Sequence, residues 1–335
     1  MSTEKTTDVF GVGNAMVDIL ALVEEDFVRE HDLPKGGMLL VDTEKQGGLL
    51  KALEGHALEM RSGGSAANTM IAIAQSGGNG FYSGKVARDT NGEFYRQDLL
   101  ESGVHFDVHP ASEEDNPTGT CLVLTTPDAE RTMLTHLGVS TQLGPADIDS
   151  ERLAKCKYSY IEGYLWDPPN PRQASVAAME ESKKHNVKVS FTFSDPFLVD
   201  RFTDDFRRVV NEYCDVLFCN ADEGRRFCET ESLDEAVQQI GKMVDLAFIT
   251  DGSEGCRVIE KGEATLVEGF KVNAIDTVGA GDAFAGGTLF GLTHGFSASQ
   301  AARWGNYLAA QVVSIQGARL HGDMSDKLDT IIQRV

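Results

Sequence analysis

The stretch Asp276–Phe284, which reads DTVGAGDAF, joins a loop with two glycines to an acidic residue and the beginning of an apolar run. Backbone N–H groups converge in a Gly-Ala-Gly turn, and a helix that begins there adds its positive dipole end, so the junction is suited to a phosphate or a developing oxyanion. Asp282 ends the loop, and a carboxylate suits such a pocket only if it takes a proton. A tight turn with an acid in the first helical turn has the same residues, so the rest of the chain must distinguish the two.

Beyond Pro145, apolar strand-like runs alternate regularly with helix-like stretches. The strand runs cover 158–161, 187–191, 216–219 and 246–249, and the helical stretches cover 172–185, 201–212 and 232–243. This spacing is typical of right-handed βαβ units, which place a parallel sheet between two layers of helices. The sequence therefore predicts an α/β fold with a mostly parallel central sheet, whose ligands lie beyond the carboxyl ends of its strands.

Two of these strand ends carry polar residues. Asn220, Asp222 and Glu223 follow the third run, and Thr250–Gly255 follows the fourth. Helix caps and turns use the same residue types, so capping is an alternative explanation. Their position at the binding edge of the predicted sheet favours a ligand site.

The N-terminal part of the chain contains two further candidate segments. The apolar run Ala15–Val23 contains one acid, Asp18, and a buried carboxylate needs either a hydroxylated ligand or a structural partner. The segment Ser62–Asn68, which reads SGGSAAN, is a glycine turn that leads into a helix and places Asn68 in its first turn. Small residues also permit close helix packing, so a purely structural role is the alternative.

Residues 104–137 have a different texture, with short alternating strands separated by turn residues. Together with residues 18–45 they predict a small sheet set apart from the main body. There is no repeat or low-complexity linker, so we expect one large α/β domain over residues 1–335 with this small β-sheet as an inserted lid. Arg131 on one of these strands is a candidate phosphate clamp, although an arginine at an exposed strand edge would look the same.

Composition restricts the partners. The 335 residues carry 30 basic and 52 acidic side chains, and the formal net charge of −22 disfavours a nucleic acid polymer or an anionic membrane. No apolar run is long enough for a membrane span and the N-terminus lacks a signal-peptide core, so we expect a cytoplasmic protein. The six cysteines and eight histidines are dispersed, which fits reduced thiols and no structural zinc.

Taken together, these motifs resemble those of the ribokinase-like carbohydrate kinase family, over about residues 9–319. Asp276–Phe284 is similar to the family's C-terminal signature and Ser62–Asn68 to its N-terminal one. The resemblance implies a three-layer α/β sandwich with a small β-sheet lid. It also implies that Asp282 is the general base, that Gly279, Ala280 and Gly281 form an anion hole, and that the substrate is bound by Asn14, Asp18, Gly64 and Asn68.

The resemblance extends to the phosphate donor. Asn220 and Glu223 match an Asn-x-x-Glu motif that organises magnesium and phosphate, with Glu223 acting on the metal through water. Thr250 and Gly252 would lie along the nucleotide phosphates, Asn306 near the purine, and Arg131 at the transferred phosphate. The implied cofactors are ATP and Mg²⁺, with a monovalent cation such as K⁺ as a further candidate. No Gly-x-x-x-x-Gly-Lys-[Ser/Thr] loop is present, so the anion hole and the metal must neutralise the phosphates.

The sequence indicates the phosphotransfer reaction more closely than it indicates which molecule accepts the phosphate. The segments 13–18, 117–121 and 160–163 look more like adenosine kinase and its bacterial relatives than like ribokinase, whereas Met38 and residues 164–169 depart from the adenosine kinase pattern. We therefore expect an ATP-dependent kinase acting on a terminal hydroxymethyl group of a nucleoside or sugar, as a monomer or homodimer. The alternatives are a fructokinase, ribokinase or 2-keto-3-deoxygluconate kinase type of sugar kinase, and a catalytically idle sugar or nucleoside sensor.

Overall fold

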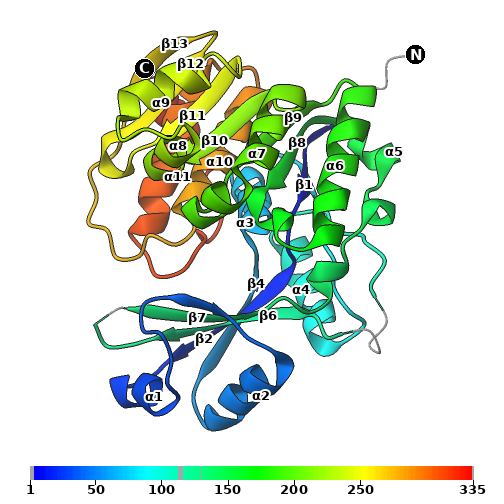
Figure 1. The fold of residues 1–335 in the computed structure, drawn as a ribbon, viewed down its shortest axis with the longest axis vertical. Coiled ribbons are helices and arrows are strands. Elements are labelled where there is room, and N and C mark those ends of the chain that lie inside the picture. The colour runs from blue at the N-terminus through cyan, green and yellow to red at the C-terminus, as the bar shows by residue number, and fades with distance from the viewer. Residues whose placement is uncertain (1–3, 112–115, 129, 334–335) are drawn as a thin grey trace.

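The computed structural model describes residues 4–111, 116–128 and 130–333, and this part of the chain forms two β-sheets (Figure 1). The large sheet consists of β1 (Thr7–Val12), β5 (Gly80–Ser83), β8 (Cys156–Glu162), β9 (Lys188–Thr192), β10 (Val216–Asn220), β11 (Leu246–Thr250), β12 (Gly255–Glu260) and β13 (Glu263–Glu268). The small sheet consists of β2 (Met16–Leu22), β3 (Met38–Leu40), β4 (Leu58–Gly63), β6 (Gly119–Thr125) and β7 (Arg131–His136).

The helices are α1 (Glu25–Glu30), α2 (Thr43–Ala52), α3 (Ser65–Gln75), α4 (Thr90–Glu101), α5 (Ser150–Leu153), α6 (Pro169–Lys184), α7 (Pro196–Glu212), α8 (Ala221–Phe227), α9 (Leu233–Ile240), α10 (Ala280–Thr293), α11 (Ala298–Val313) and α12 (Leu328–Ile332). None of the helices in the described ranges combines the length and the apolar character that a bilayer crossing requires.

The large sheet has the order β13-β12-β11-β10-β9-β8-β1-β5 and is mostly parallel. Strands β5, β1, β8, β9, β10 and β11 run parallel, and β12 and β13 continue the sheet antiparallel as a hairpin. The predicted α/β fold with a mostly parallel central sheet is confirmed. The terminal hairpin and the short helix α8 were not predicted as elements, because the strand ends before them were interpreted only as a ligand site, a helix cap or a turn.

Alternating side chains of the strands build two hydrophobic cores, one on each face of the large sheet. In β10, Val216 and Phe218 join the core under α3, α10 and α11, whereas Leu217 and Cys219 join the core under α6, α7 and α9. Successive strand residues point to opposite faces, so a continuous apolar run produces a sheet buried on both sides. The result is the helix–sheet–helix sandwich seen in Figure 1.

The small sheet has the order β3-β7-β6-β2-β4 and lies at the edge of the sandwich toward which β1 runs (Figure 1). Its first strand follows β1 after three residues, so the chain passes directly from one sheet into the other. Strand β4 lies outside the two segments predicted for this sheet, because its apolar–polar alternation covers only residues 58–61 and the strand then leads directly into the glycine turn. The role of this sheet as an inserted lid of a single domain stays a prediction.

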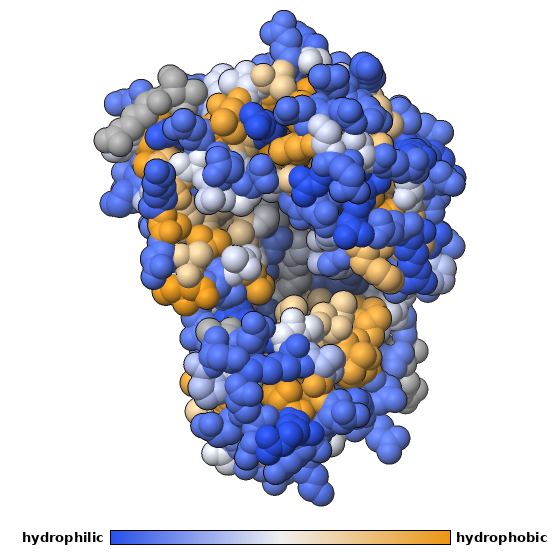
Figure 2. Space-filling model, turned by 60° about the vertical axis from the view of Figure 1, so that its left-hand side comes forward, coloured by the Kyte–Doolittle hydropathy of each residue, from blue (hydrophilic) through white to orange (hydrophobic). Residues whose placement is uncertain are grey.

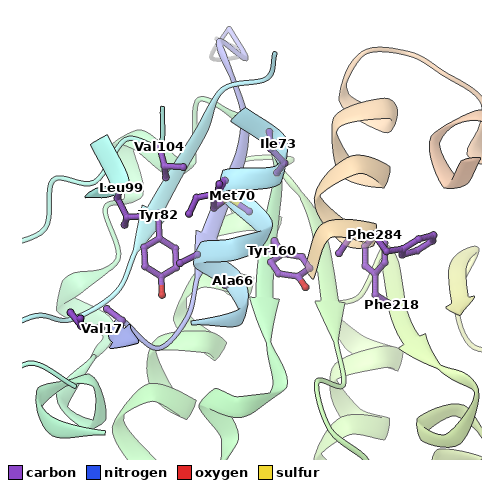
Figure 3. Packing of buried hydrophobic residues seen from close by; sticks show 14 of the residues in the cluster. Val17, Ala66, Met70, Ile73, Tyr82, Leu99, Val104, Tyr160, Phe218 and Phe284 are labelled. Carbon is purple, nitrogen blue, oxygen red and sulfur yellow. The ribbon is translucent and has the colours of Figure 1, made fainter. Parts of the chain in front are cut away.

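Two helices from distant parts of the chain pack next to each other on the large sheet. Figure 3 shows α3 with Ala66 and Met70 beside Tyr160, and the beginning of α10 with Phe284 on the other side of that tyrosine. Phe284 also packs edge-on against Phe218 of β10, with ring centroids 6.3 Å apart. This packing brings the N-terminal ends of α3 and α10 together, and those ends carry both glycine motifs.

Candidate active site

Asp282, in the first turn of α10, lies between two side chains of α3. Its Oδ1 accepts a hydrogen bond from Ser65 Oγ at 2.6 Å and its Oδ2 accepts one from Asn68 Nδ2 at 3.2 Å. Burial raises the pKa of this carboxyl to about 6, and the two hydrogen bonds oppose part of that rise. At neutral pH the group is therefore an ionised but weakly acidic carboxylate, as a general base requires.

The glycine loop before Asp282 has a conformation that only glycine adopts readily. Gly279 caps α10 with a left-handed φ of 78°, and a Cβ atom placed on it would lie 2.0 Å from the carbonyl oxygen of Ala318. Ala280 is the first residue of the helix, and a Cβ on Gly281 would meet nothing within 4 Å. The loop therefore leaves its backbone N–H groups at the start of α10 accessible to an anion.

Asp18 lies on the face of the small sheet that is turned toward α3 and α10. It lines a cavity of about 60 Å³ together with Asn68 and Val278, so Asp282, which is bonded to Asn68, lies at its margin. Burial raises the pKa of Asp18 to about 7, against the attraction of Arg319, Arg131 and Arg61, which are the cationic residues of the same cavity. Figure 2 shows a hollow between the small-sheet part and the large body.

Asn14 and Gly64 shape the wall where the two sheets meet. Gly64 caps α3 with a φ of 103°, and a Cβ atom on it would lie 2.1 Å from the Asn14 carbonyl oxygen. The Asn14 backbone N–H and side-chain Nδ2 donate to Glu162 Oε1 at 2.8 and 3.1 Å, and its own Oδ1 has no hydrogen-bond partner among the described residues. That buried oxygen is free to accept a hydrogen bond from a substrate hydroxyl.

Glu162, which the sequence analysis did not assign to the site, organises this wall. The carboxylate is buried at the end of β8, and besides the Asn14 donors its Oε2 accepts the backbone N–H of Ala66 at 2.8 Å. Burial raises its pKa to about 7, although these three N–H donors favour the ionised form. Glu162 therefore fixes the first turn of α3, from which Ser65 and Asn68 reach Asp282. The sequence signal for this role was the acid itself, since Glu162 ends the apolar strand run of β8.

The predicted phosphate and metal residues lie at the ends of β10 and β11. Asn220 Oδ1 accepts the backbone N–H of Glu223, and Glu223 Oε2 accepts the backbone N–H of Asn220, so the pair forms a capping box on α8. Thr250 is paired with Asn220 in the sheet register, and Gly252 follows it with a φ of 52° and open space around its Cα. The capping explanation is therefore correct for Asn220 and Glu223, and a ligand role is compatible with it.

Asn306 and Arg131 are engaged in structural contacts. The Asn306 side chain is buried and donates to the carbonyl oxygens of Val267 and Glu268 at 2.9 and 3.2 Å, so it holds the end of β13 and lies apart from the Asp282 group. Arg131 Nη1 forms an ion pair with Asp276 Oδ2 at 2.7 Å and is mostly buried, which differs from the exposed strand-edge alternative.

Magnesium needs few protein ligands when it binds a nucleotide, because phosphates and waters complete its octahedral shell. In the described ranges no group of three or more His, Cys, Asp or Glu side chains is arranged to hold a metal ion. Glu223 is buried, and one of its oxygens is used by the Asn220 N–H. Its carboxylate therefore fits a metal that is held mainly by the nucleotide and water.

A ribokinase-like sandwich, an acid behind a glycine loop and a cavity under a small sheet that combines apolar side chains with Asp18 and arginines are typical of small-molecule kinases. Residues 41–323 match the sequence profile of the pfkB family carbohydrate kinase. The adenosine kinase of Saccharomyces cerevisiae is 30% identical, and the match covers 93% of this chain and 95% of the yeast protein.

Two solved structures are similar over nearly their whole length. The adenosine kinase from Sinorhizobium meliloti superimposes with a TM-score of 0.88 at 34% identity, covering 97% of this chain and 99% of that one. The probable sugar kinase from Rhizobium etli CFN 42 superimposes with a TM-score of 0.89 at 33% identity, covering 97% and 98%. The chain belongs to the pfkB family of carbohydrate kinases and is a phosphotransferase with an alcohol group as acceptor.

Proposed function

We propose that this kinase transfers the γ-phosphoryl group of ATP to the terminal hydroxymethyl group of a nucleoside, with Asp282 as the general base. The observation that carries this proposal is the position of Asp282, held by Ser65 and Asn68 beside the cavity that contains Asp18. Asp18, Asn14, Asn68 and the Gly64 turn bind the acceptor hydroxyls and orient the reacting one toward Asp282. Positioning of this kind provides most of the catalysis in phosphoryl transfer.

In the reaction the acceptor oxygen attacks the γ-phosphorus while its proton passes to the Asp282 carboxylate. The bond from phosphorus to the β–γ bridging oxygen breaks, and its electron pair leaves on ADP. The backbone N–H groups of Gly279–Gly281 receive the developing negative charge, and Arg131 contributes a positive charge. Asn220, Thr250 and Gly252 orient the nucleotide, Asn306 supports the end of β13 near its base, and Glu223 would hold a magnesium ion through water. Magnesium, when bound, supplies charge neutralisation between the phosphates.

A nucleoside is favoured over a plain sugar because much of the cavity-facing side of the small sheet is apolar. Leu20, Val123 and Met133 line the cavity, and Met38 and Leu40 continue the same face by their pairing with β7. Met38 and Leu40 are 54% and 51% exposed, which is much for apolar side chains in a sheet. A flat base would cover them, and we propose that this sheet is a lid over the acceptor. Figure 2 shows apolar side chains gathered on this side of the hollow.

The proposed function is tested by ADP formation from ATP with a panel of acceptors: adenosine, other nucleosides, ribose, fructose and 2-keto-3-deoxygluconate. We expect the highest kcat/KM with a nucleoside, at least about 10-fold above ribose, because burying the base adds apolar contacts worth roughly 1.5–3 kcal/mol. A preference for free sugars would assign the chain to the sugar kinase alternative. No turnover despite ligand-induced thermal shifts would contradict kinase activity on these acceptors.

The proposed contact between Met133 of the small sheet and the nucleobase is tested by Met133→Ser. Loss of the thioether contact should raise the KM for a nucleoside about 10-fold and leave kcat nearly unchanged, while ribose kinetics stay the same. Met60→Ser is the matched control, because Met60 on β4 is paired with Ile19 and lies on the opposite face of the sheet. Equal effects of the two substitutions in steady-state kinetics would show that the base does not contact this face.

The pH dependence of kcat/KM follows from Asp282. Protonated Asp282 cannot take a proton, and since burial raises its pKa to about 6, kcat/KM should fall roughly tenfold per pH unit below about pH 6 and level off toward neutral pH. Residual activity of Asp282→Asn should lack this acid limb. A flat wild-type profile down to about pH 5, in enzyme shown by circular dichroism to be folded, would assign proton transfer to another group.

A further inference from the structure

Two arginine nitrogen atoms at the cavity are buried without a hydrogen-bond partner in the described part of the chain. They are Arg61 Nη1 and Arg131 Nη2. Other nitrogens of both side chains are engaged: Arg61 Nε and Nη2 contact Glu59 Oε1 at 2.6 and 2.5 Å, and Arg131 Nη1 contacts Asp276 Oδ2 at 2.7 Å. Buried donors in native proteins nearly always have an acceptor, so these two nitrogens indicate a ligand that supplies one.

Both guanidinium groups approach the segment that leads into the glycine loop. Asp276 Oδ2, the partner of Arg131, also accepts the backbone N–H of Gly317 at 2.8 Å. A Cβ atom placed on Gly317 would lie 2.7 Å from Arg61 Nη1. Arg61 on the edge strand β4 and Arg131 on β7 therefore both approach the backbone at Gly317, from different strands of the small sheet. The next residue, Ala318, is the one whose carbonyl contacts Gly279. The two free donors therefore lie next to the start of α10.

The third arginine of the cavity differs from these two. Arg319 donates to Ser62 Oγ at 2.9 Å and to Asp98 Oδ2 at 2.7 Å, and among the described contacts none of its buried nitrogens lacks a partner. Although burial opposes it, the bonds from Ser62 and Arg319 hold the pKa of Asp98 below its ordinary value, so this is a stable ion pair. The contacts of Arg319 with Ser62 and Asp98 therefore account for its position in the fold. No described contact accounts for the buried Nη1 of Arg61.

We propose that Arg61 is a second catalytic arginine, which joins Arg131 in binding the phosphoryl oxygens during transfer to the acceptor. This inference rests on the proposed kinase function. As the acceptor oxygen bonds to the γ-phosphorus and the bond to ADP breaks, negative charge is spread over the phosphoryl oxygens, and two guanidinium donors beside the glycine loop match that charge. The same donors would suit an anionic group carried by the acceptor, but Gly317 beside Arg61 is followed by Ala318, which contacts the glycine loop, and this position favours the phosphoryl group.

The experiment compares wild type, Arg61→Gln, Arg61→Lys and the control Arg96→Gln in steady-state kinetics with ATP and adenosine. Arg96 is an exposed arginine paired with Glu93 on α4, so its loss reproduces the charge change at a position that does not line the cavity. We expect Arg61→Gln to lower kcat roughly 10- to 100-fold with the KM for adenosine changed less than about threefold, Arg61→Lys to recover part of kcat, and Arg96→Gln to match wild type. The lysine variant keeps the test available if Arg61→Gln does not fold.

A second readout does not depend on turnover. Aluminium fluoride with MgADP and adenosine mimics the transferring phosphoryl group, and it should raise the melting temperature of wild type beyond MgADP and adenosine alone. Arg61→Gln should lose this added shift and keep the shift caused by adenosine. A raised KM with unchanged kcat would assign Arg61 to acceptor binding, and preference for an anionic sugar acid that disappears in Arg61→Gln would assign it to an acceptor anion. Wild-type inactivity would contradict the kinase proposal itself.

Discussion

Asp282→Asn should lower kcat by at least about 10²- to 10⁴-fold while the enzyme still binds ATP and acceptor. The amide keeps the shape of the side chain and can accept from Ser65, but it cannot take the proton of the attacking hydroxyl, and a positioned base contributes a factor of that size. Steady-state kinetics and calorimetric titration with each substrate measure the two parts of this prediction. Near-normal turnover would remove Asp282 from the chemistry.

The same substitution should make the fold more stable above about pH 6, which separates lost chemistry from lost structure. The folded-state pKa of Asp282 is raised from 3.8 to about 6, so the folded protein binds this proton more tightly than the unfolded chain and loses stability as pH rises between those values. Asparagine removes that loss, a gain of at most about 3 kcal/mol at neutral pH and nothing below about pH 4. Asp234→Asn, an exposed first-turn acid of α9, is the control and should change neither property.

Gly279→Ala should reduce kcat by about 10²-fold or more through the backbone of the glycine loop. Alanine disfavours the left-handed φ of 78° by roughly 1–2 kcal/mol, and its Cβ would meet the Ala318 carbonyl oxygen at 2.0 Å, so the loop must move. Moving it displaces the N–H groups at the start of α10, and removing one donor of this kind costs about 10²- to 10³-fold in kcat.

Gly295→Ala is the matched control for that substitution. Gly295 lies just beyond the other end of α10 with a φ of 82°, and a Cβ on it would meet nothing within 4 Å. It should cost a similar backbone strain, lower the melting temperature slightly and leave kcat unchanged. If Gly279→Ala behaves like Gly295→Ala in both kinetics and thermal unfolding, the loop does not act as an anion hole.

The α/β framework could be predicted from sequence because its signal is local. The runs that became β8 to β11 are short, apolar and regularly spaced, and both cores are built from alternate residues within each run. The two glycine motifs were equally visible, since loops that feed helices have few alternatives in residue type. Their joint position was foreseen only through the resemblance to a family.

The contacts that complete the site are long-range and leave little trace in the sequence. Ser65 and Asp282 are 217 positions apart, and Asn14 and Glu162 are 148 apart, so no spacing rule connects them. Arg61 is on β4, whose alternating pattern is only four residues long, and its Nη1 lies beside Gly317 from the far end of the chain. For Asn306 the resemblance implied a place near the purine, and the contact to the Val267 carbonyl that holds β13 could not be read from the sequence.

Glu162 is a buried residue that positions the side chains around Asp282. Its three N–H donors fix Asn14 and the first turn of α3, and that turn presents Ser65 and Asn68 to Asp282. A carboxylate buried in this way is costly unless its hydrogen bonds are complete. The arrangement explains how Glu162 on β8 helps to position Asp282 on α10 through the first turn of α3.

Identification of the phosphorylated product tests the central claim most directly. Wild-type enzyme is incubated with ATP, magnesium and adenosine, and the products are examined by mass spectrometry and ³¹P nuclear magnetic resonance. The account predicts ADP and a phosphomonoester on the terminal hydroxymethyl oxygen in equal amounts, with neither formed at a comparable rate by Asp282→Asn. ADP without a phosphorylated acceptor, or the same phosphomonoester formed by Asp282→Asn at the wild-type rate, would contradict it.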